Sequence, residues 1–315
     1  MFVLVTGATG FVGRHVVKEL LARGHAVRAL VHRKPANGVL PAPVEAAQGS
    51  VSNKKSLQPA AQGCDAVIHL VAVIRKRGPN PFDRINVEGT RNVVQAAKSA
   101  GAKRFIHVSA LGAQNNERYP YLLSKWRSEE AVKSAGLPYV IYRFSIMFGE
   151  GDEFTNSLAG LVKAFPIVPV VGSGKNKFQP IHVEDVARCI VLSLERPELN
   201  GDTLELGGPQ YLTYDDIIDV IARTLGKRPP KLHIPVAVMK PMAALMDIAT
   251  PRSPVTTDQL DLLAVPNYAE IGSVEKASGF SPRPMEGNLD YVKKIKASDG
   301  LRIALGFMPK HIRDH

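Results

Sequence analysis

The 315-residue sequence predicts an α/β fold, a doubly wound parallel sheet followed by a smaller mixed lobe. Short apolar runs alternate with helical stretches over the first 145 residues, which is typical of a parallel sheet. The runs place apolar residues on both faces of the strand, as strands covered by helices on both sides require. After about residue 148 the rhythm loosens. We therefore expect a first domain at residues 1–148 and a smaller lobe at 149–315, with later segments interleaved with the first domain.

Each element of the first domain follows from its local pattern. Six short apolar, β-rich runs predict strands, at 2–6, 26–31, 44–48, 66–73, 104–109 and 139–144. The segments between them place apolar residues three and four positions apart, and several end at glycine, as helices do. These predicted helices are 13–24, 54–63, 84–101 and 121–136.

The second half gives fewer signals. Thr213 is a good N-cap for an amphipathic helix, because Asp215 and Asp216 follow it in the first turn. Another segment is apolar nearly all round and contains Pro241. The expected elements are a strand end running into a helix at 181–195, a strand at 201–208, and helices at 213–226, 235–251 and 256–265.

Charge is unevenly distributed along the chain. Residues 1–150 carry a balance of +12, and residues 151–315 a balance of −1. A basic first half indicates an anionic ligand, such as a phosphorylated cofactor, nucleic acid or an acidic membrane surface, unless it is only a generic basic surface. No aromatic-and-basic recognition motif accompanies the charge, so we do not expect nucleic-acid binding.

Composition limits the cellular setting. The chain opens with a strand and a glycine turn, which does not resemble a signal peptide, and no apolar run approaches about 18 residues, so no transmembrane segment is expected. Cys64 and Cys189 form neither a disulfide framework nor a metal-ligand pattern. We expect a cytoplasmic protein without a metal site, and leave open peripheral attachment at the inner face of a membrane.

Residues 6–13 read TGATGFVG, with glycines spaced G-x-x-G-x-x-G at the first strand–helix junction. One glycine permits the tight turn, another lets backbone amides approach a pyrophosphate, and the third lets the helix pack on the sheet. The helix N-terminus then presents N–H groups to the phosphates. The motif predicts a Rossmann-type dinucleotide site whose contacts are Gly7, Thr9, Gly10, Phe11, Val12 and Gly13.

The end of the second strand predicts the form of the dinucleotide. An acidic residue there would bind the ribose hydroxyls, whereas a basic one would pair with a 2′-phosphate. The sequence has no carboxylate at this point but reads Val31-His32-Arg33-Lys34. We expect Arg33 to bind the 2′-phosphate, assisted by His32 or Lys34, and therefore favour NADP(H) over NAD(H).

The stretch YLLSK places Tyr121 four residues before Lys125, so both side chains lie on one face of a helix. The pattern alone is weak, because 8 tyrosines and 20 lysines in 315 residues supply about half a match by chance. Its position in the helix after the fifth predicted strand makes it informative.

Together these motifs resemble the extended and atypical short-chain dehydrogenase/reductases. The resemblance covers residues 1 to about 190 and includes TGATGFVG, AVIHLVA, INVEGTRNVVQAA, RFIHVSALGA, YLLSK and IHVEDVA, in that order. RFSIMFGEGDEFTNSLAGL at 143–161 and PVTTDQLDLLAVPN at 254–267 are more closely similar to one subgroup. That subgroup is typified by the 39 kDa accessory subunit of respiratory complex I and its bacterial relatives.

The resemblance implies roles for individual residues. Tyr121 would act as acid/base, and Lys125 would lower its pKa and hold the nicotinamide ribose. A serine polarises the substrate carbonyl in this family, and the matching position is either Ser109 or Ala110. Asn86 matches a family asparagine near the site, or is a structural hydrogen-bonding residue. Further cofactor contacts are expected at Ser50, Val51, Leu70, Val71, Lys125 and Phe144.

Two hypotheses for function follow. If Ala110 occupies the serine position, the catalytic set is incomplete; the gap of 12 residues from Ser109 to Tyr121 is also shorter than in the family's epimerases and dehydratases. The chain would then hold NADP(H) structurally, as an accessory or assembly factor for a membrane respiratory or quinone-related complex. The alternative is an active reductase, dehydrogenase or epimerase that uses Tyr121 and Lys125.

Overall fold

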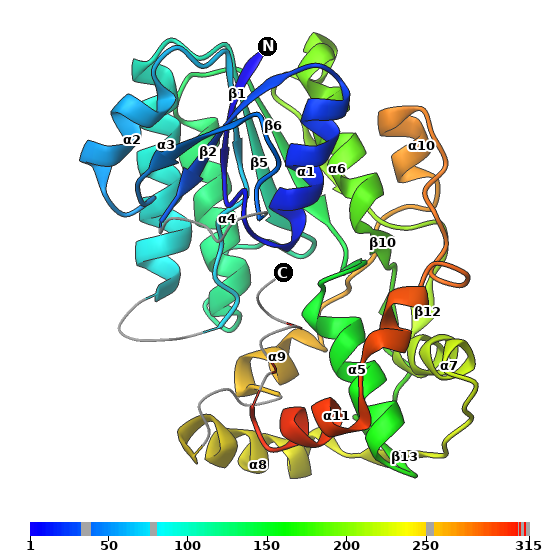
Figure 1. The fold of residues 1–315 in the computed structure, drawn as a ribbon. Helices are drawn as coiled ribbons and strands as arrows, with labels where there is room; N and C mark the ends of the chain where they lie inside the picture. Colours follow the sequence, from blue (N-terminus) through cyan, green and yellow to red (C-terminus); the bar gives the residue numbers. More distant parts are fainter. Residues whose placement is uncertain (33–38, 76–80, 250–254, 308, 310–311, 313–315) are drawn as a thin grey trace. The chain divides into compact units, whose positions relative to one another are not determined.

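A computed structural model describes residues 1–32, 39–75, 81–249, 255–307, 309 and 312. The chain forms two compact units, and two later segments return to the first (Figure 1). Unit 1 comprises Met1–Phe144, Val183–Leu206 and Ser273–Phe280. Unit 2 comprises Ser145–His182, Gly207–Gly272 and Ser281–His315.

Unit 1 is built on one seven-stranded sheet in which every neighbouring pair is parallel. The spatial order is β3-β2-β1-β4-β5-β6-β11, so the direction of winding reverses between β1 and β4. The strands are β1 (Phe2–Thr6), β2 (Ala26–Val31), β3 (Val44–Gln48), β4 (Ala66–His69), β5 (Arg104–Ala110), β6 (Tyr139–Phe144) and β11 (Thr203–Leu206). The predicted doubly wound Rossmann-type sheet is confirmed.

Helices cover both faces of this sheet (Figure 1). One face carries α1 (Phe11–Ala22) and α6 (Val183–Leu192). The other carries α2 (Lys54–Ala61), α3 (Glu88–Ser99) and α4 (Pro120–Lys133). A core cluster that includes Leu4, Val67, Phe105 and Ile141 packs the sheet against α2, α3 and α4. The shorter elements of unit 1 are the π-helical turn η1 (Phe82–Val87), the 3-10 turns η2 (Ser193–Glu195) and η3 (Pro197–Leu199), and α10 (Ser273–Ser278).

Several predicted boundaries of unit 1 differ from the structure, two of them by four residues. The fourth strand was expected to reach residue 73, but β4 ends at His69. The side chain of Asn86 binds both the N–H and the carbonyl of Val73, so this residue has side-chain partners in place of a sheet ladder. The helix expected at 84–101 begins at Glu88, because η1 precedes it. π-helical turns are frequent at functional sites.

Unit 2 combines short strand pairs with helices. Its strands are β7 (Met147–Phe148) beside β10 (Ile181–His182), β8 (Val168–Val171) beside β13 (Lys231–Ile234), and β9 (Lys177–Phe178) beside β12 (Leu212–Thr213). Its helices are α5 (Glu153–Ala164), α7 (Tyr214–Thr224), α8 (Val236–Ala249), α9 (Thr257–Leu262) and α11 (Ala297–Ala304), with the 3-10 turn η4 (Asp290–Lys294). Thr213 caps α7 in a capping box with Asp216, as the sequence predicts for the cap.

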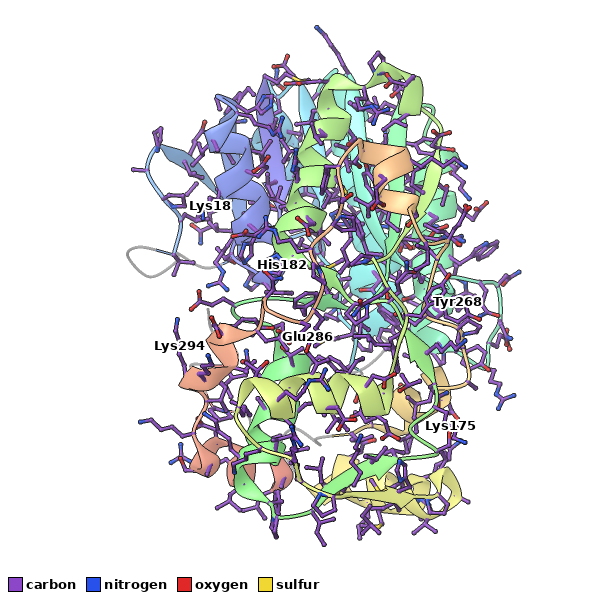
Figure 2. All side chains as sticks on the ribbon, turned by 90° about the vertical axis from the view of Figure 1, so that its right-hand side faces the viewer. Lys18, Lys175, His182, Tyr268, Glu286 and Lys294 are labelled. Atoms are coloured by element: carbon purple, nitrogen blue, oxygen red, sulfur yellow. The ribbon has the colours of Figure 1, made fainter. Side chains whose placement is uncertain are left out.

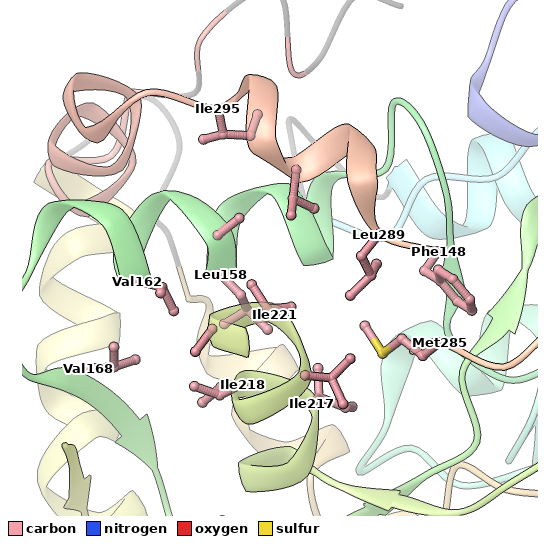
Figure 3. Close-up of a cluster of buried hydrophobic side chains, with 14 of the residues drawn as sticks. Phe148, Leu158, Val162, Val168, Ile217, Ile218, Ile221, Met285, Leu289 and Ile295 are labelled. Carbon is pink, nitrogen blue, oxygen red and sulfur yellow. The ribbon is translucent and has the colours of Figure 1, made fainter. Parts of the chain in front are cut away.

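The core of unit 2 lies between α5, α7 and the chain after residue 284 (Figure 3). Its buried members include Phe148, Leu158, Val162, Val168, Ile217, Ile218, Ile221, Met285, Leu289 and Ile295. Charged side chains of both signs lie on the outside, among them Lys175, Glu286 and Lys294 (Figure 2). Across the parts of the chain that the structure describes, no helix is both long and apolar enough to cross a bilayer.

Helices α5 and α11 meet at two glycines. A Cβ atom on Gly300 would lie 2.0 Å from the carbonyl oxygen of Gly160, which is far inside van der Waals contact. The absence of both side chains therefore allows the backbones of the two helices to touch.

This contact predicts the effect of one methyl group. In an open helix, Gly→Ala stabilises by about 1 kcal/mol. For Gly300→Ala, overpacking against a backbone atom should outweigh that gain, and we expect a net loss of about 1–3 kcal/mol in unfolding free energy by urea denaturation. Ser298→Ala, on the exposed side of the same helix, should change little. Unchanged stability of Gly300→Ala would contradict the close packing.

Candidate functional site

The glycine turn of unit 1 is closely packed on both sides. Gly7 has φ of +78°, a backbone conformation that glycine adopts without strain. A Cβ atom there would lie 3.3 Å from Leu70 and Val71, so the turn rests on the segment that follows β4. A Cβ atom on Gly13 would lie 2.0 Å from the carbonyl oxygen of Gly7. The three-residue spacing of the glycines thus brings α1 directly against the turn.

This packing shapes a backbone cradle at the start of α1. Gly10 is the N-cap and supplies no side chain to bind the first helical amides, which have no partner within a helix. Phe11 and Val12 are partly exposed, and Gly10 is exposed. N–H donors at a positive helix end, with no side chain in front of them, suit the diphosphate of a dinucleotide. The residues present therefore fit the predicted cofactor.

Other predicted contacts follow the neighbouring strands. Ser50 and Val51 come after β3; Asn92 donates to the carbonyl oxygen of Val51 at 3.0 Å, which holds that loop on α3. Thr9 is partly buried in the glycine turn. His32 lies exposed after β2, whereas Arg33 and Lys34 are outside the described residues.

Phe144, at the end of β6, is 2% exposed. Its ring stacks on Tyr142, with the ring centroids 5.2 Å apart and the planes at 10°. The side chain is therefore packed in the interior, and its backbone carbonyl accepts a hydrogen bond from the N–H of Leu111.

Tyr121 and Lys125 both lie near the start of α4. The ammonium of Lys125 is buried and donates to the carbonyl oxygen of Val108 at 2.7 Å, its one hydrogen bond within the described residues. Tyr121 is partly buried, its ring is 6.1 Å from that of Phe82, and its hydroxyl has no hydrogen bond to any described residue. Both side chains thus keep polar capacity for a ligand.

Burial governs the ionisation of this pair. It raises the pKa of Tyr121 to about 12. It lowers the pKa of Lys125 to about 8, against the opposing effect of the Glu129 carboxylate. The charge of Lys125 adds to burial in lowering the pKa of His69 and of His107, but no charge offsets burial at Tyr121. Without a ligand, the tyrosine is therefore held as a neutral phenol.

The hydroxyl of Ser109 points to the buried carboxylate of Glu129 on α4. It donates to Oε1 of Glu129 at 2.5 Å. Glu129 is fully buried and accepts two hydrogen bonds from Arg143, at 2.9 and 2.7 Å, and Arg143 also donates to Glu205 at 2.9 Å. This network joins α4 to β5, β6 and β11. Ser109 is thus engaged within the protein, and the next residue, Ala110, has no hydroxyl.

Asn86 is a buried bridge between η1, the loop after β4 and α4. Besides its two bonds to Val73, its amide donates to the hydroxyl of Ser124 at 2.9 Å. Ser124 in turn donates to the carbonyl oxygen of Tyr121 at 2.7 Å. The asparagine therefore fixes the backbone around the tyrosine, which is the structural role that the sequence left open.

A chain of buried hydrogen bonds fixes the tautomer of His69. Thr90 donates its only hydroxyl hydrogen to the carbonyl oxygen of Asn86, at 2.5 Å. The oxygen of Thr90 must then accept from Nε2 of His69, at 3.0 Å. Nδ1 of His69 consequently accepts from the hydroxyl of Thr6, at 2.7 Å. Thr6 is the last residue of β1, so this chain ties the glycine turn to η1.

His107 stacks on His69, with ring centroids 5.4 Å apart and an angle of 19° between the planes. Neither ring nitrogen of His107 has a hydrogen-bond partner among the described residues. Neither the Thr6–His69–Thr90 chain nor the Glu129–Arg143 pair was predicted from the sequence. Polar residues at the ends of adjoining apolar strands, namely Thr6 and His69, were the available signal.

A model of the NAD dependent epimerase/dehydratase family matches residues 3–207, more than half of the chain. The chain belongs to this family. Its matched region spans the glycine turn, the tyrosine–lysine pair and all but the first residue of the parallel sheet of unit 1.

Individual relatives differ in their described roles. A ceramide reductase from Caulobacter vibrioides is 34% identical over 78% of this chain and 77% of its own length. The mitochondrial subunit 9 of the NADH dehydrogenase (ubiquinone) 1 alpha subcomplex from Arabidopsis thaliana is 29% identical over 79% of this chain, and the match spans 64% of that subunit. The photosystem II assembly factor Ycf39 of Trieres chinensis is 25% identical over 76% of this chain and 74% of its own.

Solved structures agree with the fold. The crystal structure of gox2253 is 28% identical and has a TM-score of 0.74 over 98% of this chain and 99% of its own. A UDP-glucose 4-epimerase from Thermotoga maritima has a TM-score of 0.73 at 18% identity, over 94% of this chain and 98% of its own. The epimerase supports the fold alone.

The buried histidine predicts a pH-dependent stability. Burial lowers the pKa of His69 from 6.5 to about 3. The contribution of the neutral His69 side chain to the free energy of unfolding is therefore complete above pH 6.5 and is lost as the pH falls toward 3. We expect unfolding free energy in this window to fall less steeply for His69→Gln than for the wild type, by up to about 1.4 kcal/mol per pH unit. Urea denaturation at a series of pH values measures the slopes. His32→Asn, at an exposed position, is the control, and equal slopes for wild type and His69→Gln would refute the assignment.

Proposed function

We propose that this protein binds NADP(H) in unit 1 and holds it mainly for structure, as an accessory or assembly factor of a membrane-associated complex. The observation that carries the proposal is the engagement of Ser109 with the buried Glu129, beside Ala110, which offers no hydroxyl. A carbonyl substrate beside Tyr121 would lack the serine that polarises it. Cofactor binding, by contrast, needs mainly backbone amides and Lys125.

The glycine turn and the first amides of α1 would hold the diphosphate, and Lys125 the nicotinamide ribose. The cofactor, when bound, supplies a hydride donor or acceptor. Arg33 would bind the 2′-phosphate. The relatives named for NADH dehydrogenase and photosystem II assembly support an accessory role at a membrane complex.

An active reductase is the second candidate. The hydroxyl of Tyr121 makes no hydrogen bond to a described residue, and Lys125 lies one helical turn away with its pKa lowered to about 8. In such an enzyme Tyr121 would give or take a proton at the substrate oxygen, and Lys125 would orient the ribose. The ceramide reductase of Caulobacter vibrioides supports this candidate.

Cofactor binding is tested by thermal shift and titration with NADPH and NADH. We expect NADPH to bind more tightly than NADH. Arg33→Ala should lower the affinity for NADPH by about tenfold or more and leave the affinity for NADH unchanged. Lys18→Ala, which removes an exposed charge from α1, is the control (Figure 2). Failure to bind either dinucleotide would refute the proposal, whereas tighter binding of NADH would refute only the role of Arg33.

The role of Ser109 separates the two candidates. Ser109→Ala should lower the unfolding free energy by about 1.5–3 kcal/mol, because Glu129 loses a charge-assisted hydrogen bond. The affinity for NADPH should not change. NADPH oxidation is then followed with long-chain ketones and sugar nucleotides, with Tyr121→Phe as the inactive control. Turnover that needs Tyr121 would support the reductase. If Ser109→Ala also abolishes that turnover at unchanged stability, the serine is catalytic.

A further inference from the structure

Helix α8 of unit 2 presents three large apolar side chains to solvent. Leu245 is 68% exposed, Val238 54% and Met242 50%, while the small Ala243 is 1% exposed. Together with the exposed Pro241, the three larger residues recur at three- and four-residue spacing and form one continuous stripe. The other face of α8 carries the buried Ala243 and the partly buried Met239 and Met246, so the stripe is a second apolar face that is left uncovered.

The charged residues of α8 lie away from this stripe. Lys240 pairs with Asp261 of α9 at 2.9 Å, and Asp247 accepts a hydrogen bond from the N–H of Thr257 at 3.4 Å. Both therefore hold the helix against the α9 segment, which runs beside it in Figure 1. Among the described residues of α8, the stripe Val238, Pro241, Met242 and Leu245 contains no polar side chain.

The composition and size of the stripe select its partner. Protein interfaces use aromatic and arginine anchors and need about 800 Å² per partner. The stripe has neither kind of anchor and exposes roughly 300 Å² of apolar side chain. A second copy of the chain would therefore be held weakly by this surface alone. The boundary between lipid headgroups and acyl chains requires neither shape complementarity nor hydrogen bonds, and a helix lying in its plane suits such a stripe.

We propose that the α8 stripe inserts into the surface of a lipid bilayer, as the membrane contact of this protein. The proposal rests on the membrane-associated part of the proposed function and is independent of cofactor binding, which belongs to unit 1. Because both charges of α8 are engaged with the α9 segment, insertion should need no anionic lipid and should persist at high salt.

The test is sedimentation of the full chain with phosphatidylcholine vesicles, with and without phosphatidylglycerol, at low and high salt. We expect binding to phosphatidylcholine alone, and a loss of about tenfold or more in Leu245→Glu and Met242→Glu. Ile271→Glu, at a 47% exposed apolar residue of unit 2 outside α8, should bind like the wild type. Circular dichroism and thermal unfolding verify that each variant is folded.

A second measurement reports whether residue 245 enters the bilayer. Leu245→Cys, labelled with an environment-sensitive dye, should shift its emission to the blue on phosphatidylcholine vesicles, whereas the same label at Ile271→Cys should not. Absence of binding to either vesicle would overturn the proposal. So would binding to anionic vesicles only, reversed by salt and unchanged in Leu245→Glu, or a dimer in light scattering that Leu245→Glu dissociates. NADPH affinity, measured on the same variants, should stay unchanged.

Discussion

The contact between Gly13 and the carbonyl oxygen of Gly7 is the constraint on which the site of unit 1 depends. With 2.0 Å between a Cβ at residue 13 and that oxygen, no other amino acid permits α1 to start where it does. The approach sets the direction of the helix and leaves its first amides uncovered. It also places the turn against Leu70 and Val71 at the end of β4, where the winding of the sheet reverses. In open α/β sheets this is where ligands bind.

Buried hydrogen bonds connect the glycine turn to the helix that carries Tyr121 and Lys125. Thr6, at the end of β1, is linked through His69 and Thr90 to Asn86. Asn86 in turn binds the backbone of Val73 and the hydroxyl of Ser124 on α4. The Glu129–Arg143 pair holds the other face of α4. In a low-dielectric interior, a polar group without a hydrogen-bond partner is costly. Each of these hydrogen bonds therefore strongly favours a single geometry. The positions of Tyr121 and Lys125 thus depend on buried side chains outside the pair.

Much of unit 1 could be predicted from sequence because most of its strands are buried runs of apolar residues. The runs at 2–6, 26–31, 44–48 and 139–144 match the strands residue for residue. The end of β4 could not be predicted, since the Asn86 side chain that binds Val73 lies 13 residues further along. The hydrogen bond of the Ser109 hydroxyl could not be predicted either, because its partner Glu129 lies 20 residues further along the chain, on a helix. In unit 2 the apolar character of 235–251 was visible, but a segment that is apolar nearly all round does not show which face is covered.

The two candidate functions both use Lys125 and differ in the other groups that they need. The cradle is made of backbone amides and of glycines that no side chain can replace, so it persists as long as the turn folds. Polarising a carbonyl needs one hydroxyl at one position, which a single substitution to alanine removes without disturbing the sheet. In this chain Ser109 is engaged by Glu129 and the next residue, Ala110, has no hydroxyl, whereas the backbone cradle depends on neither side chain. Within one family, the same fold can thus serve both reductases and accessory proteins.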